Sequence, residues 1–83
     1  MNYSVIVDVT LRKGIADPEG STIERALPAL GFTGVTNMHA GKSFRFDVEA
    51  DDEEAALAKA TALAERLLSN PVIEDASARI EEL

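Results

Sequence analysis

The sequence contains no cysteine, no tryptophan and a single histidine among its 83 residues. The absence of cysteine excludes disulfides and thiolate metal sites, and it gives no sign of an oxidising compartment. Only His39 could supply an imidazole ligand. A chain this short has a thin core, and chains of this size usually gain stability from disulfides, a metal or oligomerisation. We therefore expect one domain over residues 1–83 that self-associates.

Basic residues are also scarce, since 8 Lys and Arg face 15 Asp and Glu and leave a net charge of −7. Nucleic-acid affinity depends on cationic side chains that neutralise phosphates, so this balance argues against nucleic acid and against an anionic membrane surface. No apolar run approaches the roughly 20 residues of a transmembrane helix. The first three residues lack the basic-then-apolar layout of a signal peptide. We therefore expect a cytoplasmic protein.

The first third of the chain predicts a strand followed by a helix. Residues 3–11 alternate between apolar and polar side chains, as in a strand with one buried face. Residues 17–19 match a helix start, with a capping carboxylate, a proline suited to the first helical position and an acid at the positive end of the dipole. The helix should end at Gly31, which suits a left-handed terminator, and Pro28 should kink or tighten it.

The rest of the chain predicts two strands, a helix and a last strand. The strand signals at 34–40 and 42–50 flank Gly41, so they form either a tight hairpin or one long bent strand. Asp51 and Glu54 have capping-box spacing before a helix that Asn70 and Pro71 end. Its apolar stripe consists of Leu57, Ala60, Ala64, Leu67 and Leu68. With a last strand at about 72–81, the order predicts a ferredoxin-like β-α-β-β-α-β α+β sandwich, with both helices on one face of an antiparallel sheet.

Two short motifs could carry ligand chemistry, and each has a simpler structural explanation. Residues 40–43, Ala-Gly-Lys-Ser, look like the end of a phosphate loop, but six residues separate Gly34 from Gly41 where the motif needs four. The alternating pattern that follows predicts a strand, not the helix N-terminus that holds phosphate. Residues 51–54 could bind a divalent cation through carboxylates. Four consecutive residues on a helix splay around its axis, so capping is favoured.

Three further titratable side chains are candidates for acid–base chemistry. Asp17 and Glu19 are favoured as cap and dipole partners over catalytic carboxylates. His39 is the one side chain that titrates near neutrality, and without an evident partner it is favoured as a surface or interface residue. No obvious nucleophile for amide hydrolysis is present. The sequence therefore predicts no catalytic, cofactor-binding or metal-binding residue in this chain.

Three segments resemble the PurS family, and together they span most of the chain. The first is residues 11–20, LRKGIADPEG, continuing through residues 26–27 and 30–32. The second is Gly41 and Lys42 followed by the alternating strand to Ala50, and the third is residues 67–75, LLSNPVIED. None is specific alone, but their order, their spacing and the total length together are specific.

The resemblance implies a non-catalytic small subunit of phosphoribosylformylglycinamidine synthase, a ligase of purine biosynthesis. That enzyme converts formylglycinamide ribonucleotide, ATP and glutamine to formylglycinamidine ribonucleotide, ADP, phosphate and glutamate. The resemblance places ATP and Mg in a large synthetase subunit and ammonia release in a glutaminase subunit. This chain would form a homodimer or higher homo-oligomer that bridges the two and supports ammonia transfer.

The loops that carry the resemblance have no core role that explains them, so they are the expected partner interface. Pro18 and Pro71 add the rigidity that interfaces favour. His39 stands where the family commonly has Arg, which puts in doubt a contact that needs a permanent charge. The residues predicted to contact partners are Lys13, Gly14, Asp17, Pro18, Gly20, His39, Gly41, Lys42, Asn70 and Pro71.

Two other functions fit the same predicted fold. A small-molecule-sensing regulatory module could bind an amino acid at residues 13–17, although such modules are normally fused to an enzyme. A small cofactor-free oxygenase or isomerase would need an apolar cavity with a few polar groups, and the aromatic content of 5% makes that cavity hard to build.

Overall fold

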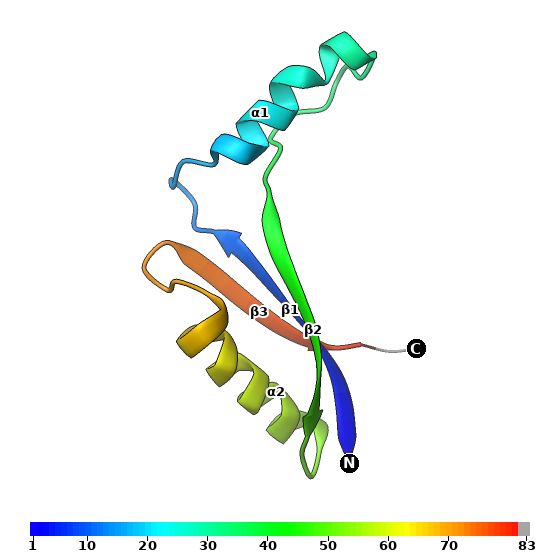
Figure 1. The fold of residues 1–83 in the computed structure, drawn as a ribbon, viewed down its shortest axis with the longest axis vertical. Helices are drawn as coiled ribbons and strands as arrows, with labels where there is room; N and C mark the ends of the chain where they lie inside the picture. The colour runs from blue at the N-terminus through cyan, green and yellow to red at the C-terminus, as the bar shows by residue number, and fades with distance from the viewer. Residues whose placement is uncertain (82–83) are drawn as a thin grey trace.

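The computed structural model describes residues 1–81 and shows a three-stranded antiparallel sheet with two helices (Figure 1). Strand β1 lies in the centre, in the order β2-β1-β3. Helix α2 covers one face of the sheet, and α1 lies beyond its end (Figure 1). The predicted α+β class with an antiparallel sheet is confirmed. In chain order the elements are β1 (Asn2–Leu11), α1 (Pro18–Ala26), the 3-10 turn η1 (Pro28–Leu30), β2 (Gly41–Glu49), α2 (Glu53–Leu63), the π-helical turn η2 (Ala64–Leu68) and β3 (Glu74–Ile80).

The core lies between β1 and the helix formed by α2 and η2. The β1 side chains Val5, Val7 and Val9 are fully buried, as the alternation predicts. The fully buried side chains that the helix contributes to this layer are all small, Ala56, Ala60 and Ala64, and Leu68 packs against them from the edge while partly exposed. Because alanine adds one methyl group beyond the backbone, the helix can approach the sheet closely. The core is therefore thin and intolerant of larger side chains.

The opposite face of the sheet has no helix over it and is largely polar. Ile6 is the exception, being only 5% exposed. Its register partners on the two neighbouring strands are Arg45 and Arg79, whose aliphatic stems can cover an apolar neighbour. Both guanidinium groups are paired on this face, Arg79 with Asp8 at 2.6 Å and Arg45 with Glu81 at 3.0 Å. On the face that no helix covers, long charged side chains therefore shield Ile6 from solvent.

The expected strand at 34–40 does not form, which corrects the four-strand order. The backbone φ angles are positive at Gly34 (80°) and Asn37 (58°), and a strand cannot continue through such residues. Neither a hairpin nor one long strand is present, since β2 begins at Gly41. The amides of Met38 and Ala40 donate to side chains of the α1 region and not to a neighbouring strand. The segment therefore lies along α1 as an unpaired extended chain.

The first helix is shorter than expected and does not pack on the sheet face. Helix α1 ends at Ala26, and the chain tightens into η1 from Pro28, as the proline predicts. Gly31 follows with φ 89°, confirming the left-handed terminator. Only Gly20 is buried within α1. The expectation of two helices on one sheet face is therefore wrong for α1, because none of its apolar side chains reaches the core.

The boundaries of α2 and β3 differ from the expected ones for local reasons. Asp52, not Asp51, caps α2, and its Oδ1 accepts from the Ala55 amide at 2.7 Å. The expected apolar stripe fails at Leu67, which is exposed because the wider π-helical turn of η2 changes the direction of its side chains. Strand β3 begins at Glu74 and not at Val72, because the Glu74 amide still closes a turn onto the Asn70 carbonyl at 2.8 Å.

Candidate functional site: the hinge of a projecting arm

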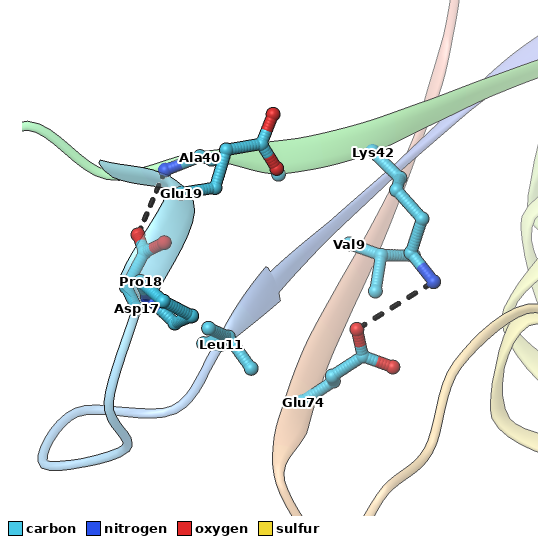
Figure 2. Close-up of a pocket in the computed structure, with 9 residues that line it drawn as sticks. Val9, Leu11, Asp17, Pro18, Glu19, Ala40, Lys42 and Glu74 are labelled. Carbon is cyan, nitrogen blue, oxygen red and sulfur yellow. Dashed lines mark hydrogen bonds and ion pairs between the residues drawn. The ribbon is translucent and has the colours of Figure 1, made fainter. Parts of the chain in front are cut away.

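The molecule has a projecting arm, which we define as residues 12–40. The arm leaves the sheet after Leu11 and returns at Gly41, so that α1 lies beyond the sheet end where β1 finishes and β2 and β3 begin (Figure 1). A shallow pocket of about 250 Å³ marks the place where the arm meets the sheet. We call this place the hinge (Figure 2), and its lining residues are Val9, Leu11, Asp17, Pro18, Glu19, Ala40, Gly41, Lys42 and Glu74.

The Asp17 carboxylate is the centre of the hinge. Its Oδ1 accepts from the Gly20 amide at 2.8 Å, which caps α1 as predicted, and its Oδ2 accepts from the Ala40 amide at 2.9 Å. The side chain is only 11% exposed. The pKa of Asp17 is lowered, most by the hydrogen bond from the Gly20 amide and next by the one from the Ala40 amide. Burial acts in the opposite direction and raises the pKa, and the nearby His39 lowers it further. The Asp17 carboxylate, near the start of the arm, therefore binds the backbone at the end of the arm.

A second carboxylate fastens the returning segment to α1. Glu24 Oε1 accepts from the Met38 amide at 2.8 Å. Glu24 lies seven residues after Asp17, two helical turns along the same side of α1, so the two acids meet alternate amides of one extended chain. Gly20 lies between them, where an added Cβ would be 2.5 Å from the Met38 carbonyl oxygen. The helix and the returning chain are therefore in direct backbone contact.

The turn before β3 is linked to the start of β2 through Glu74. Its Oε1 accepts from the Asn70 amide at 2.7 Å, and its Oε2 lies 3.6 Å from Lys42 Nζ (Figure 2). Glu74 is largely buried, whereas Lys42 is mostly exposed. The Asn70 side chain in turn accepts from the Val72 amide at 3.1 Å, which fixes the turn at Pro71. This network holds the predicted contact loops at a set spacing.

The other side of the hinge opens into a second pocket of about 490 Å³. The loop after β1 lines it, with Asp17, His39 and Ala40 at its edge. The His39 Nδ1 lies 3.7 Å from Asp17 Oδ2, yet the imidazole is 76% exposed. His39 therefore faces the surroundings at the arm, as expected for a surface or interface residue.

The structure brings all the predicted contact residues to this one end of the sheet. Asp17, Pro18, Gly41 and Lys42 line the hinge, and Lys13, Gly14 and His39 line the second pocket. Gly20 lies beneath the returning chain, and the turn at Asn70 and Pro71 is joined through Glu74. The sequence analysis did not predict that the carboxylates of Glu24 and Glu74 accept hydrogen bonds from the amides of Met38 and Asn70. The spacing of Glu24 from Asp17 was the available signal, because it places both acids on one side of the helix.

The carboxylates of Asp17 and Glu74 in the hinge both have structural partners. Both Asp17 oxygens accept backbone amides, and Lys42 and Ser43 lie on β2, so residues 40–43 do not form a phosphate loop. In residues 51–54 Asp52 is a helix cap. Within residues 1–81, no three acidic or imidazole side chains are grouped as a metal site. No helix in this part of the chain is long and apolar enough to cross a bilayer.

The far end of the arm carries exposed apolar side chains. Leu30 is 69% and Phe32 57% exposed, and Val35 lies nearby in the same connection. Ile15 in the loop before α1 and Ile23 on α1 are exposed as well. Isolated exposed apolar residues are common, but several of them on one projecting part of a molecule point to a protein-contact surface. The fold and the hinge together define a small α+β domain that presents a braced arm.

Comparisons with known proteins identify the family. The model of the PurS family, described as phosphoribosylformylglycinamidine (FGAM) synthase, matches residues 4–82. The PurS subunit from Methanocaldococcus jannaschii is 36% identical over 81 residues, 98% of each chain. The subunit from Mycobacterium leprae is 43% identical over 72 residues, 84% of this chain and 85% of that one. The chain therefore belongs to the PurS family.

Solved structures agree with this assignment. The crystal structure of the PurS subunit of this synthase from Thermotoga maritima matches with a TM-score of 0.89 and 34% identity, covering 98% of this chain and 93% of that one. A chain in the structure of PurLQS from Thermotoga maritima matches with the same score and identity, covering 98% and 99%. The chain is a small subunit of a glutamine-dependent, ATP-using ligase. This assignment replaces the sensing-module and oxygenase alternatives.

Proposed function

We propose that this chain bridges the synthetase and glutaminase subunits of its synthase in the cytoplasm and supports transfer of ammonia between them. The observation that carries the proposal is the braced arm, whose exposed Leu30 and Phe32 extend from a hinge fixed by Asp17. The relatives add support, since one matching chain comes from a PurLQS structure. Another matching structure is that of PurS from Methanocaldococcus jannaschii, one of the subunits of formylglycinamide ribonucleotide amidotransferase in the purine biosynthetic pathway.

The contribution of the chain in this proposal is geometry. Ammonia released at one site must reach an activated intermediate at another before it is protonated or lost to water. Holding both sites in one assembly raises the effective concentration of the second reactant by orders of magnitude. ATP and Mg belong to the synthetase subunit in this arrangement, and this chain holds no cofactor. Self-association of the chain, as a dimer or higher oligomer, is part of the same proposal.

The braced hinge suits this task because an interface loses less free energy when its loops are already ordered. The carboxylates of Asp17 and Glu24 fix the returning chain against α1, and Glu74 fixes the turn at Asn70. The exposed side chains of Lys13 and His39 then lie at constant positions relative to the apolar end of the arm. In this proposal the exposed members of the predicted contact set act as one pre-ordered surface, and the buried Gly20 supports it from beneath.

Reconstitution of the three subunits tests the bridging role. Replacing Leu30 and Phe32 by alanine should lower glutamine-dependent synthesis severalfold and leave ammonia-dependent synthesis nearly unchanged, because only ammonia delivery needs the bridge. Leu67→Ala is the matched control, since Leu67 is as exposed as the arm residues but lies on η2. Equal losses with glutamine and ammonia, or an equal effect of the control, would contradict the proposal.

Copurification gives a second, independent test. The chain isolated from its source cell should bring the synthetase and glutaminase subunits with it, and the Leu30 and Phe32 variant should bring less of both. The net charge of −7 predicts that association also slows as salt is raised, because a basic patch on a partner would attract an acidic surface. Copurification of neither subunit would exclude the bridge.

A further inference from the structure

The projecting arm differs in charge from the rest of the chain. Residues 12–40 contain three basic and three acidic residues besides His39, so the net charge of −7 belongs entirely to the other residues. The arm lies at one end of a molecule that is 50 Å long, and the acidic residues 51–54 lie near the other end (Figure 1). The two ends therefore present different charges to their surroundings.

Two acidic side chains of the arm are turned inward, whereas two of its basic ones are free. Asp17 and Glu24 accept backbone amides. The third acid, Glu19, lines the hinge and not the second pocket. Lys13 and Arg25 form no ion pair within residues 1–81. The outward surface of the arm is therefore more basic than its composition alone indicates.

Lys13 lies in a tight turn that borders the second pocket. The Ile15 amide donates to the Arg12 carbonyl at 3.1 Å, and Gly14 has a φ of 88°. A type II turn requires this left-handed conformation at its third position, and glycine adopts it without strain. The backbone of Lys13 is thus already ordered at the rim of the pocket, so only its side chain must be ordered when a partner binds.

The second pocket combines apolar walls with two groups that can bind an anion. Leu11 and Ile15 supply apolar surface, and Lys13 and His39 supply nitrogen donors. Asp17 also lies at its edge, but both of its oxygens accept backbone amides and its side chain is only 11% exposed. The lining therefore suits a side chain with an apolar stem and a carboxylate head.

We propose that the second pocket receives a carboxylate side chain from an acidic loop of a partner subunit, with Lys13 as its counter-ion and His39 as a hydrogen-bond donor. This contact rests on the proposed bridging role and adds the chemistry of the partner surface, which is acidic where it meets the arm. Its test changes Lys13 and leaves the apolar end of the arm intact. Failure of this contact and failure of the bridging role can therefore be told apart.

A small free anion is the competing occupant of the pocket. Lys13 and His39 are both accessible to solvent at its rim, and exposed ion pairs contribute little by themselves. Free phosphate would gain only these contacts. A protein loop would also cover Leu11 and Ile15 and exclude water from the charged groups, which strengthens their attraction. A protein carboxylate is therefore favoured over a free anion.

Zero-length crosslinking reads the proposed contact directly. A water-soluble carbodiimide joins a lysine amine to a carboxylate through an amide bond, without a spacer, so the two groups must touch. In the reconstituted three-subunit enzyme, Lys13 should be joined to an Asp or Glu of a partner subunit, as identified by mass spectrometry of the peptides. Lys13→Arg is the matched control, because it keeps the positive charge and the subunit affinity but cannot form this crosslink.

Charge reversal tests the same contact by affinity. Lys13→Glu should raise the dissociation constant for that partner roughly tenfold or more, because two carboxylates would then meet in the pocket. Arg66→Glu makes the same change of charge on η2, where Arg66 also lacks an ion pair within the described residues, and should have an effect below about twofold. Replacing the crosslinked partner carboxylate by lysine should restore the affinity of Lys13→Glu. Circular dichroism confirms that each variant is folded.

Each outcome supports or overturns the proposal. A Lys13 crosslink that is lost in Lys13→Arg, together with weaker binding of Lys13→Glu but not of Arg66→Glu, supports it. Unchanged affinity of folded Lys13→Glu overturns it, as does an assembled enzyme in which Lys13 forms no crosslink. Inorganic phosphate that shifts the amide signals of Lys13 and His39 in the isolated chain, while Lys13→Glu abolishes these shifts and keeps the subunit affinity, assigns the pocket to a free anion. Association with neither subunit would remove the bridging role and this contact with it.

Discussion

The Asp17 carboxylate accepts a hydrogen bond at 2.9 Å from the amide of Ala40, which lies 23 residues later in the chain. The other oxygen of the same carboxylate caps α1 through Gly20. One side chain therefore links the start of the arm to its end. Without it, the returning chain would keep the Met38 tie to Glu24 but would lose its fixed position where it enters β2.

Asp17→Asn should loosen this link while keeping the size of the side chain. An amide group has one oxygen acceptor, so it can accept from Gly20 or from Ala40 with its oxygen but presents hydrogens on its other side. We expect hydrogen exchange at the Gly20 and Ala40 amides to rise severalfold, with little change at the centre of β1. Ser21→Ala, on an exposed position of α1, is the control. Unchanged exchange at both amides would show that the tie is unimportant.

The same carboxylate predicts a local response to acid. Its folded pKa lies below the ordinary value of 3.8, because the Gly20 and Ala40 amides and then His39 favour the charged form. A group with a lowered pKa stabilises the fold fully above its ordinary value, and this contribution is lost as the pH falls through the folded pKa. The arm should therefore loosen only as the pH drops below 3.8.

Amide proton shifts of Gly20 and Ala40 would record this titration. In urea unfolding, the stability difference between the natural chain and Asp17→Asn should shrink as the pH falls below 3.8, because protonation removes what the substitution has already removed. A difference that grows toward low pH would contradict the sign. His39→Gln separates the contribution of the imidazole, which lies 3.7 Å from Asp17.

Features set by neighbouring residues could be predicted from the sequence. The alternation of β1, the cap at Asp17 and the tightening at Pro28 each depend on a few adjacent positions, and all three are confirmed. The conformation of residues 34–40 depends instead on two distant carboxylates, because Met38 bonds to Glu24, 14 residues earlier, and Ala40 bonds to Asp17, 23 residues earlier. The pattern of the sequence does not reveal such contacts. The burial of Ile6 could not be predicted from the sequence either, because Arg45 and Arg79 come beside it only through strand pairing.

The contact residues were predicted as three separate loops, and the fold joins them. Strand β1 ends where β2 and β3 begin, so the antiparallel order alone brings the loops to one end of the sheet. The connections between them could not be predicted, since Glu24 and Glu74 read as ordinary solvated acids until the register is known. Whether partners bind there stays a prediction.

Gly20→Ala should weaken the arm even though alanine favours helices by about 1 kcal/mol. The new Cβ would be 2.5 Å from the Met38 carbonyl oxygen and 2.6 Å from Asp17 Oδ2, so α1 and the returning chain would have to separate. We expect faster exchange at Met38 and Ala40. Thr22→Ala, exposed on the same helix, should leave these amides protected. Slower exchange in Gly20→Ala would show that helix propensity dominates.

Ala60→Leu should test the thin core between β1 and α2. Ala60 is fully buried against the valines of β1, so added methylene groups must push the helix from the sheet, which typically costs about 1–3 kcal/mol. Ala58→Leu places the same side chain on the exposed side of α2, where the change should stay within about 0.5 kcal/mol. Urea unfolding of both variants measures the difference. Equal stabilities would mean that the helix moves freely, and the close approach to β1 would then have no energetic role.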